Sequence, residues 1–495
     1  MVTMMVVMLL TIMTVGVLNV TGNALHIGRV RRLQADAFNA AESGAEIAAL
    51  WFRRQNSAPP YTSPWNPLGG QQSMGDGITF QVTVYPDSEN STAYLKTYRI
   101  VSTGSISATS KQVEIVIRQA TFGRFAYFTD RETSSISGGA IWWKAGEICD
   151  GPAHSNNSSG SNFQINYNGS TDSIFKDILT GSGPSINYQP SQPQDEATYR
   201  RIFEDGSKGF KLGVPRIDLP ESSDIQRNAA WGGESGFPGS NGVYLRSDQD
   251  GGIYVRGDCT MEWSVPSSST QRITIKQGWS STYTVDVNLA TGATTLTKPN
   301  GSTETGGMVN GVVYCTGNIN SLKGEIADNR VSGGEITRRS AWTIATDVVN
   351  GKDIEITDDL EYRTQPNKTL PSDASVNLAA GTLGLVAYDV RISSSAPRNL
   401  EVDAVMMAGG RNTSGGSFYV ENYSSKTPVG TLTVTGGIIQ KARGPVGTFN
   451  SHTGQMQTGY SKNYAYDPRL ATYPPPFYPT TGTYERLSWR ALADQ

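Results

Sequence analysis

The chain is poor in charge, cysteine and histidine, and each shortage excludes a class of function. Charged residues make up 17% of the 495 residues and the formal net charge is −3, so no electrostatic argument favours nucleic acid as a partner. The three cysteines, Cys149, Cys259 and Cys315, are an odd number, which excludes a complete set of intramolecular disulfides. Their spacing matches no zinc motif, and we expect buried, unreactive side chains.

Motifs for catalysis and metal binding are also missing. The chain has no phosphate-binding glycine loop, nucleophile elbow or HExxH sequence. His154 has no neighbouring carboxylate that would make it a base, and Asp248 and Asp250 begin a calcium-like loop whose closing acid is replaced by Cys259. Aspartates next to glycine, such as Asp258, are typical of solvated turns. We therefore expect no enzyme activity, no cofactor and no metal.

What the sequence does have is a long apolar start. Residues 1–20 carry no charge, and a run of that length can cross a bilayer as one helix. Small residues then recur every three or four positions between Val30 and Trp51, with charged residues on much of the remaining surface. We predict one continuous helix over residues 1–54, apolar in its first part and amphipathic in its second.

This helix resembles a known family. The segment LQADAFNAAESGAEIAALWFRR, which contains the A-F-x-A-A-E-x-G pattern at Ala37–Gly44, is similar to the N-terminal helix of type IV pilins, especially PilX-like pilus-assembly proteins. The resemblance implies a subunit that the helix holds in the inner membrane until it packs into the core of a filament. Members usually carry glutamate where this chain has Met5.

The residues expected to form the filament spine follow from this resemblance. The large apolar side chains of the first part would pack between copies, and the small residues of the second part would let another helix approach closely. These twelve residues are Val6, Val7, Leu9, Leu10, Ile12, Val15, Val17, Leu18, Ala37, Ala41, Gly44 and Ala48.

Three alternating runs follow a proline-rich break after Arg54 and predict a small antiparallel sheet over residues 55–122. We expect this sheet to cover the second part of the helix and to bury Ile47, Leu50 and Trp51. The fold class is thus α+β at the N-terminus.

Residues 123–470 consist of short runs of β-forming residues between polar turns, which predicts a large all-β domain. Aligning GGIYVRGDC with GVVYCTGNI matches Tyr254 to Tyr314, Val255 to Cys315 and Cys259 to Ile319. This match suggests stacked coils of a parallel β-solenoid; a β-sandwich is the alternative. Residues 176–245 and 262–304 are expected to be insertions, and the Pro- and aromatic-rich residues 471–495 to be a cap or a strap to a neighbouring subunit.

The sequence therefore predicts a structural protein, not an enzyme. It would self-assemble into a helical homopolymer on the cell surface, with the inner membrane and the pilus assembly machinery as earlier partners and a surface ligand as a further possibility. The alternatives are a minor subunit at the filament tip, or a membrane-anchored solenoid that acts as an adhesin or on carbohydrates.

Overall fold

The chain divides into two compact units. The computed structural model describes residues 1–55, 59–158, 161–169, 172–366, 378–410 and 415–493. Unit 1 comprises Met1–Ala120 and Gly482–Gln495, and unit 2 comprises Thr121–Thr481. Unit 2 is therefore inserted into the sequence of unit 1.

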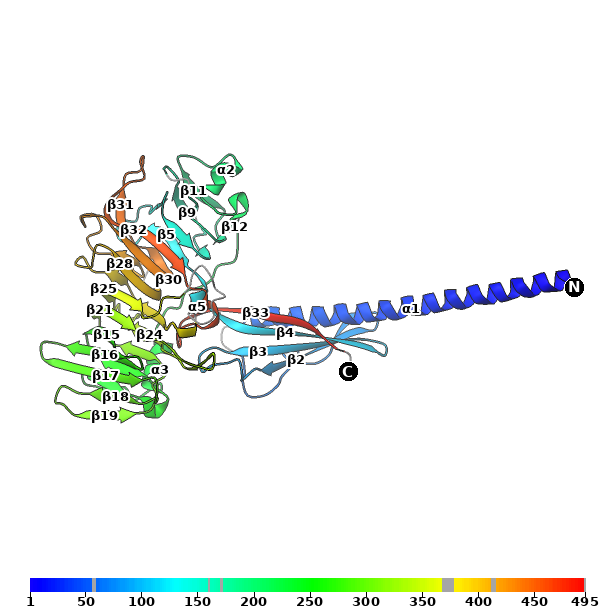
Figure 1. Cartoon of the computed structure of the whole chain (residues 1–495), viewed down its shortest axis with the longest axis horizontal. Coiled ribbons are helices and arrows are strands. Elements are labelled where there is room, and N and C mark those ends of the chain that lie inside the picture. The colour runs from blue at the N-terminus through cyan, green and yellow to red at the C-terminus, as the bar shows by residue number, and fades with distance from the viewer. Residues whose placement is uncertain (56–58, 159–160, 170–171, 367–377, 411–414, 494–495) are drawn as a thin grey trace. The chain divides into compact units, whose positions relative to one another are not determined.

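Unit 1 combines one long helix with one sheet (Figure 1). Helix α1 runs without a break through Val2–Phe52, as the predicted single helix requires. The sheet has five strands in the order β1-β2-β3-β4-β33, and β2, β3 and β4 are antiparallel neighbours. The bounds are β1 Gln72–Gly75, β2 Ile78–Pro86, β3 Thr97–Ile106, β4 Thr109–Thr121 and β33 Thr480–Leu492. The three alternating runs in the sequence are thus β2, β3 and β4.

The last strand corrects the expected role of residues 471–495. Residues 480–492 of this segment form β33, which completes the sheet of unit 1 and does not cap the end of the coils. The Tyr484 ring lies 4.9 Å from the Phe52 ring of α1, and Glu485 pairs with Arg118 of β4 at 2.8 Å. Arg118 and Glu485 are 367 residues apart in sequence, so no local pattern could predict their pairing.

Unit 2 is built from strands that pair in parallel from one coil of the chain to the next. One ladder has ten strands in this spatial order: β12 Phe210–Leu212, β10 Leu179–Gly181, β8 Ala153–Ser155, β5 Tyr127–Ser134, β30 Gly430–Arg443, β28 Leu400–Ala408, β26 Thr382–Ala387, β24 Ala341–Thr346, β20 Val312–Cys315 and β14 Ile253–Arg256. A second ladder contains β15 Cys259–Ser267, β21 Ile319–Ile326, β25 Ile354–Tyr362, β28, β30, β32 Met456–Tyr466 and β7 Ile148–Asp150.

Shorter elements complete unit 2. The other strands are β6 Trp143–Lys144, β9 Ser161–Asn166, β11 Ser185–Gln189, β13 Gly242–Leu245, β16 Thr270–Gln277, β17 Ser281–Asn288, β18 Thr294–Thr297, β19 Thr303–Gly306, β22 Arg330–Ser332, β23 Glu335–Arg338, β27 Val390–Ile392, β29 Phe418–Val420 and β31 Gly447–Phe449. The helices are α2 Glu196–Arg200, α3 Asp224–Trp231 and α5 Arg469–Thr472, with 3-10 turns η1 Phe122–Arg124, η2 Gly206–Lys208 and η3 Ser247–Gln249.

The coils do not stack in the order of the sequence. β5 is the first strand of unit 2, yet it lies in the middle of the ladder, between β30 and β8. The chain builds β8, β10 and β12 on one side, crosses to the far end at β14, and stacks back until β30 meets β5. Residues 176–245 are therefore not an insertion beside the coils. They contain β10, β12 and the segment 213–241, which we call the crossing segment because it connects β12 to β13 at the far end.

The predicted match between two coils is confirmed. Tyr254 pairs with Tyr314 and Val255 with Cys315, while Cys259 pairs with Ile319. Alternate residues of the two matched segments lie in the interior cluster; they are Ile253, Val255, Cys259, Val313, Cys315 and Ile319. The two tyrosines point to the other face, where their rings stack at 5.7 Å. Alternation of side chains along a strand explains both placements.

The crossing segment and the proline-rich end of unit 2 cover this other face. Ala230 of α3 and Leu470 of α5 are fully buried with the outward side chains of β14, β20, β24, β26 and β28. Ser223 donates to the Thr346 carbonyl at 2.7 Å, and Gln226 donates to the Phe477 carbonyl at 2.6 Å. Strands β14, β20, β24, β26 and β28 are thus buried on both faces, as their apolar sequences require.

Residues 262–304 leave the stack as predicted. The end of β15 and strands β16, β17, β18 and β19 form an antiparallel meander, and the NLATGA segment makes the turn between β17 and β18. The Asn288 amide donates to the Ala293 carbonyl at 2.8 Å across this turn. We call residues 264–311, which lie between the last stacked residue of β15 and the start of β20, the excursion.

A column of polar side chains runs along one row of turns. The Oδ1 atom of each member accepts a backbone N–H from the next coil: Asp258 from Asn318, Asn318 from Asp353, and Asp353 from Asp389, at 2.8, 3.0 and 3.2 Å. Burial and the nearby charge of Asp389 raise the pKa of Asp353 to about 6, although Arg391 opposes the change. Asp258 is therefore a structural turn residue.

Candidate functional site

The first part of α1 exposes a continuous apolar surface. The eight large residues expected in the filament spine, from Val6 to Leu18, are each 51–65% exposed. No Asp, Glu, Lys or Arg occurs before Arg29, so the uncharged segment of 28 residues is roughly 42 Å long at the rise of an α-helix. Figure 1 shows this part of the helix extending well past the sheet of unit 1.

Three threonines in this segment satisfy their hydroxyl donors within the helix. The hydroxyls of Thr11, Thr14 and Thr21 each donate to the carbonyl four residues earlier, at 2.7–2.8 Å. Back-bonded threonines leave few unmet donors at the surface. This part of the helix therefore suits a water-free environment.

By length and composition, α1 can cross a membrane. It is the one helix of this kind among the residues that the structure describes, and its most apolar window has no buried part. A helix in the core of a soluble domain would be covered by its own chain. This segment instead needs an apolar partner from outside the chain.

The second part of α1 packs against its own sheet. Ala37, Ala41 and Ala48 have no exposed surface, and Gly44 faces Phe80 and Ser102. These four residues were expected to admit a helix of another copy. That role is wrong, because strands β2 and β3 already occupy the space.

Two glycines allow this close approach. A Cβ atom on Gly104 of β3 would lie 2.9 Å from the Ala40 Cβ, and closer still to the Ala37 carbonyl oxygen and the Ala41 nitrogen. A Cβ on Gly44 would lie 2.6 Å from a ring carbon of Phe80. Distances below about 3 Å require backbone or ring shifts, so each contact needs a glycine on one of the two elements.

The opposite face of the same helical stretch carries the larger apolar residues. Ile47 and Leu50 are 40% and 48% exposed, so the expectation that the sheet would bury them is wrong, while Trp51 is half-buried. The sheet selects the Ala and Gly stripe because only small residues permit its close approach. The Phe38 ring lies on the sheet side of the helix, where it packs edge-on against Trp489 of β33 at 6.3 Å.

The N-terminus offers no carboxylate for a pairing between copies. Met5 is 70% exposed, and its amide donates only to the Met1 carbonyl, at 3.2 Å. The first acidic residue of the helix is Asp36, which lies near Arg32. The exposed surface of the first part of α1 thus carries no acidic side chain.

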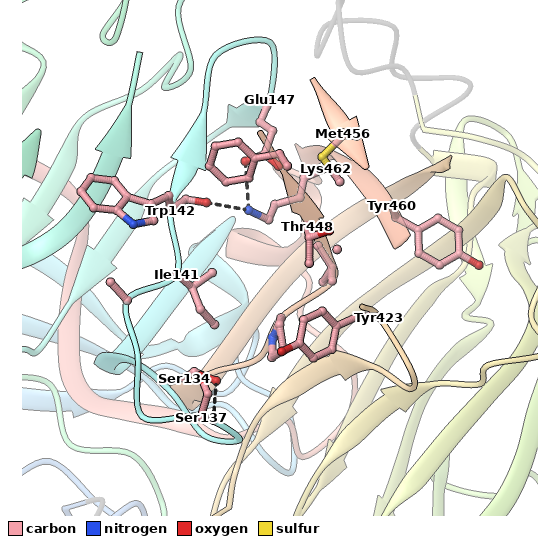
Figure 2. Close-up of a pocket in the computed structure, with 15 residues that line it drawn as sticks. Ser134, Ser137, Ile141, Trp142, Glu147, Tyr423, Thr448, Met456, Tyr460 and Lys462 are labelled. Atoms are coloured by element: carbon pink, nitrogen blue, oxygen red, sulfur yellow. Dashed lines mark hydrogen bonds and ion pairs between the residues drawn. The ribbon is translucent and has the colours of Figure 1, made fainter. Parts of the chain in front are cut away.

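Unit 2 contains a pocket of about 240 Å³ where its first coil meets its last coils (Figure 2). Figure 2 shows Lys462 between Trp142 and Glu147; its Nζ donates to Glu147 Oε2 at 2.9 Å and to the Trp142 carbonyl at 3.3 Å. Burial lowers the pKa of Lys462 to about 8, although Glu147 opposes the change. Each charge has a partner, so this part of the pocket carries no net charge.

A second buried ion pair lies on the same coils. Arg443 of β30 and Glu132 of β5 are each 1% exposed and lie 3.1 Å apart. The guanidinium also lies over the Tyr127 ring, and burial raises the pKa of Glu132. The sequence did not predict either pair, because a charged residue in a polar β-run looks the same whether it points outward or inward. The two ion pairs connect the first coil to the last coils.

The other residues considered from sequence have structural surroundings. His154 is 2% exposed, stacks on Phe128 at 5.0 Å, and bonds to Thr180 and Asn156; burial lowers its pKa. Asp250 sits in a turn with a left-handed backbone. Within the described ranges, no group of three or more His, Cys, Asp or Glu side chains is placed to hold a metal ion.

No protein-family model matches this chain, and no curated protein matches its sequence. Among solved structures, a match is found to the competence-associated pilin ComZ from Thermus thermophilus, with 13% identity over 93% of this chain and 98% of that chain. The TM-score is 0.31, which is too low for the match to carry an argument.

Proposed function

We propose that this protein is a structural subunit of a type IV pilus-like extracellular filament, and that it assembles through α1. The observation that carries the proposal is the uncovered, charge-free first part of a helix whose second part is fixed to an antiparallel sheet. An apolar surface of this length is unstable in water and needs lipid or other helices around it.

The same surface serves both states of the subunit. Before assembly, the uncharged segment spans the inner membrane, and lipid solvates Val6, Leu10 and their neighbours. During assembly the lipid is exchanged for helices of other copies. The exchange costs little because lipid tails and leucine side chains are equally apolar, and helix packing then decides the geometry. The pilus assembly machinery would extract the subunit from the membrane.

The exposed face of the second part extends the contact surface. Ile47 and Leu50 point away from the sheet, in contrast to the Ala and Gly stripe. We assign to them the role first given to Ala37, Ala41, Gly44 and Ala48, namely packing against a neighbouring copy below the membrane-spanning part.

Unit 2 is best interpreted as a β-solenoid carried by the subunit. Parallel pairing from coil to coil, a polar column along one row of turns, and a continuous interior cluster support this interpretation over a sandwich. The paired charges of Lys462 and Glu147 support a structural role rather than catalysis. We assign the binding of any surface ligand to this unit.

A position at the filament tip is the main alternative. Met5 favours it, because the first part of α1 has no acid that could pair with the terminal amine of a copy above it. A subunit at the tip needs to pack against copies on one side only.

Gold-labelled antibody against unit 2, applied to filaments sheared from cells, tests the proposal. Label along the filament supports a spine subunit, and label confined to one end supports a tip subunit. If the antibody labels only membrane vesicles and no filament, the proposal fails.

A further inference from the structure

Two of the three cysteines lie together at the base of the excursion. Cys259 is the first residue of β15, and Cys315 is the last residue of β20. Their Sγ atoms are 3.6 Å apart, and the two residues are 3% and 0% exposed. The Cys315 thiol also lies 3.2 Å from the Gly257 carbonyl oxygen.

The register of the coils places these thiols next to one another. Cys315 pairs with Val255 of the coil below, and Cys259 pairs with Ile319 of the coil above. Each cysteine therefore stands at the corner between the two ladders, one on each of two consecutive coils. Both side chains point into the interior, and their sulfurs, 3.6 Å apart, lie within roughly 1.6 Å of the bond length of ~2.05 Å.

The excursion begins after one cysteine and ends before the other. Between them the chain leaves the parallel stack as β16–β19 and returns at β20. A covalent bond here would close a loop of more than 50 residues and hold the place where the excursion joins the coils. Closure of a long loop restricts the unfolded chain strongly.

The third cysteine does not compete for this pairing. Cys149 lies on β7, six strand steps along the second ladder from β15, through β21, β25, β28, β30 and β32. Six steps correspond to roughly 29 Å at the spacing of paired strands. The odd number of cysteines thus resolves into one neighbouring pair and one isolated thiol.

We propose that Cys259 and Cys315 form a disulfide in the exported protein. The inference rests on the proposed function, because disulfides form and persist outside the cytoplasm. The oxidant is a protein disulfide donor of that compartment. The thiolate of one cysteine attacks the donor disulfide and forms a mixed disulfide, and the second cysteine displaces the donor. Two electrons and two protons pass to the donor, which leaves as a dithiol.

The bond must form before the coils are complete. In the folded chain the hydrogen bond to Cys315 and burial raise the pKa of Cys259 well above its ordinary value, so the reactive thiolate is scarce. Neither sulfur is accessible to a donor protein after folding. Oxidation therefore accompanies folding of the excursion and the two coils.

Thiol counting tests the proposal. The full chain, isolated in detergent from cells that export it, is denatured and alkylated without reductant, and its mass and peptides are measured. We expect one alkylated residue, Cys149, together with a cross-linked peptide pair that contains Cys259 and Cys315. After reduction, all three cysteines should be alkylated. Three alkylated cysteines before reduction would overturn the proposal.

A parallel refolding experiment separates this inference from the proposed function. The denatured, reduced chain is refolded with oxidised glutathione. If the Cys259–Cys315 bond forms on refolding but not in the chain isolated from cells, the proposal is overturned, because the protein is then not folded in an oxidising compartment outside the cytoplasm. If it forms in neither, the pairing itself is wrong.

Variants show what the bond does. Cys259→Ser, Cys315→Ser and the double variant should each lower the Tm of unit 2 by about the same amount, on the order of 5 °C or more, and reductant should not lower it further. Cys149→Ser is the control, because its Tm should still fall when reductant is added. For this comparison the wild-type protein is unfolded in denaturant, reduced and refolded in reductant before its Tm is measured. A wild-type Tm that this treatment leaves unchanged would contradict the assignment.

Discussion

Replacement of Gly104 by alanine should release α1 from its sheet. A Cβ at this position meets the helix backbone at Ala37 and Ala41, which cannot move as a flexible side chain would. The helix must lift by about 1 Å along the stretch where Ala40, Ala48 and Phe52 are fully buried. Overpacking a tight core costs roughly 1–3 kcal/mol, and we expect the upper end of this range, about 3 kcal/mol, because backbone is displaced.

Hydrogen exchange measured by mass spectrometry can localise this loss. A cost of about 3 kcal/mol corresponds to roughly 100-fold faster exchange in peptides that cover residues 37–52 and 97–106. Peptides from β26 and β28 in unit 2 should not change. Gly22→Ala is the matched control, since nothing lies within 4 Å of a Cβ there and alanine favours the helix. Wild-type exchange rates in Gly104→Ala would refute the close packing of helix and sheet.

Three further outcomes follow from the structure. Glu132→Gln should lower the Tm of unit 2 by about 5 °C or more, because it leaves the buried Arg443 charge without its partner, and Arg443→Met in the same chain should recover part of the loss in a thermal unfolding scan. The folded-state pKa of Asp353 is raised to about 6. The stability that this carboxyl group contributes is therefore fully present below about pH 4 and is lost as the pH rises through about 6. The free energy of unfolding of Asp353→Asn, relative to that of the wild type, should therefore rise by about 1 kcal/mol between pH 4 and pH 7, a figure reduced for solvent screening. A difference between the two proteins that stays constant across this range in denaturant titrations would contradict the shift. Val15→Lys should abolish filaments, whereas Glu89→Lys, in an exposed turn of unit 1, should not. Membrane fractionation shows whether the first variant still inserts, and normal filaments from it would argue against the assembly surface.

The local elements could be predicted because their patterns are local. The uncharged run and the spacing of small residues specify α1, and the alternating runs specify β2, β3 and β4. The match of Tyr254 with Tyr314 could be predicted because consecutive coils repeat the same pattern of inward and outward residues. The pairing of Cys259 with Ile319 followed from the same alignment.

Pairings between distant parts of the chain could not be predicted. β33 pairs with β4 although the whole of unit 2 separates them in sequence, and β5 lies between β30 and β8. Nothing in these short runs of residues distinguishes one partner strand from another. Such contacts depend on which edges remain unpaired after the other coils have formed.

The face of α1 that meets the sheet was also assigned wrongly. Larger apolar residues usually mark a core, and this expectation placed Ile47 and Leu50 under the sheet. The structure buries Ala41 and Gly44 instead, because Gly104 lets β3 approach the helix backbone directly. A consequence is that leucine at positions 41 and 44 would disrupt unit 1 itself and would not report on filament assembly alone. Ile47→Ala and Leu50→Ala are better probes of contacts between copies.

Cryo-electron microscopy of purified filaments tests the central claim most directly. A density map should show the first part of α1 from many copies packed together in the filament core, with Val6, Leu10 and Val17 in contact with helices of other copies, and unit 2 should lie outside that core. Chains that remain single in lipid, or filaments whose core lacks these helices, would contradict the account.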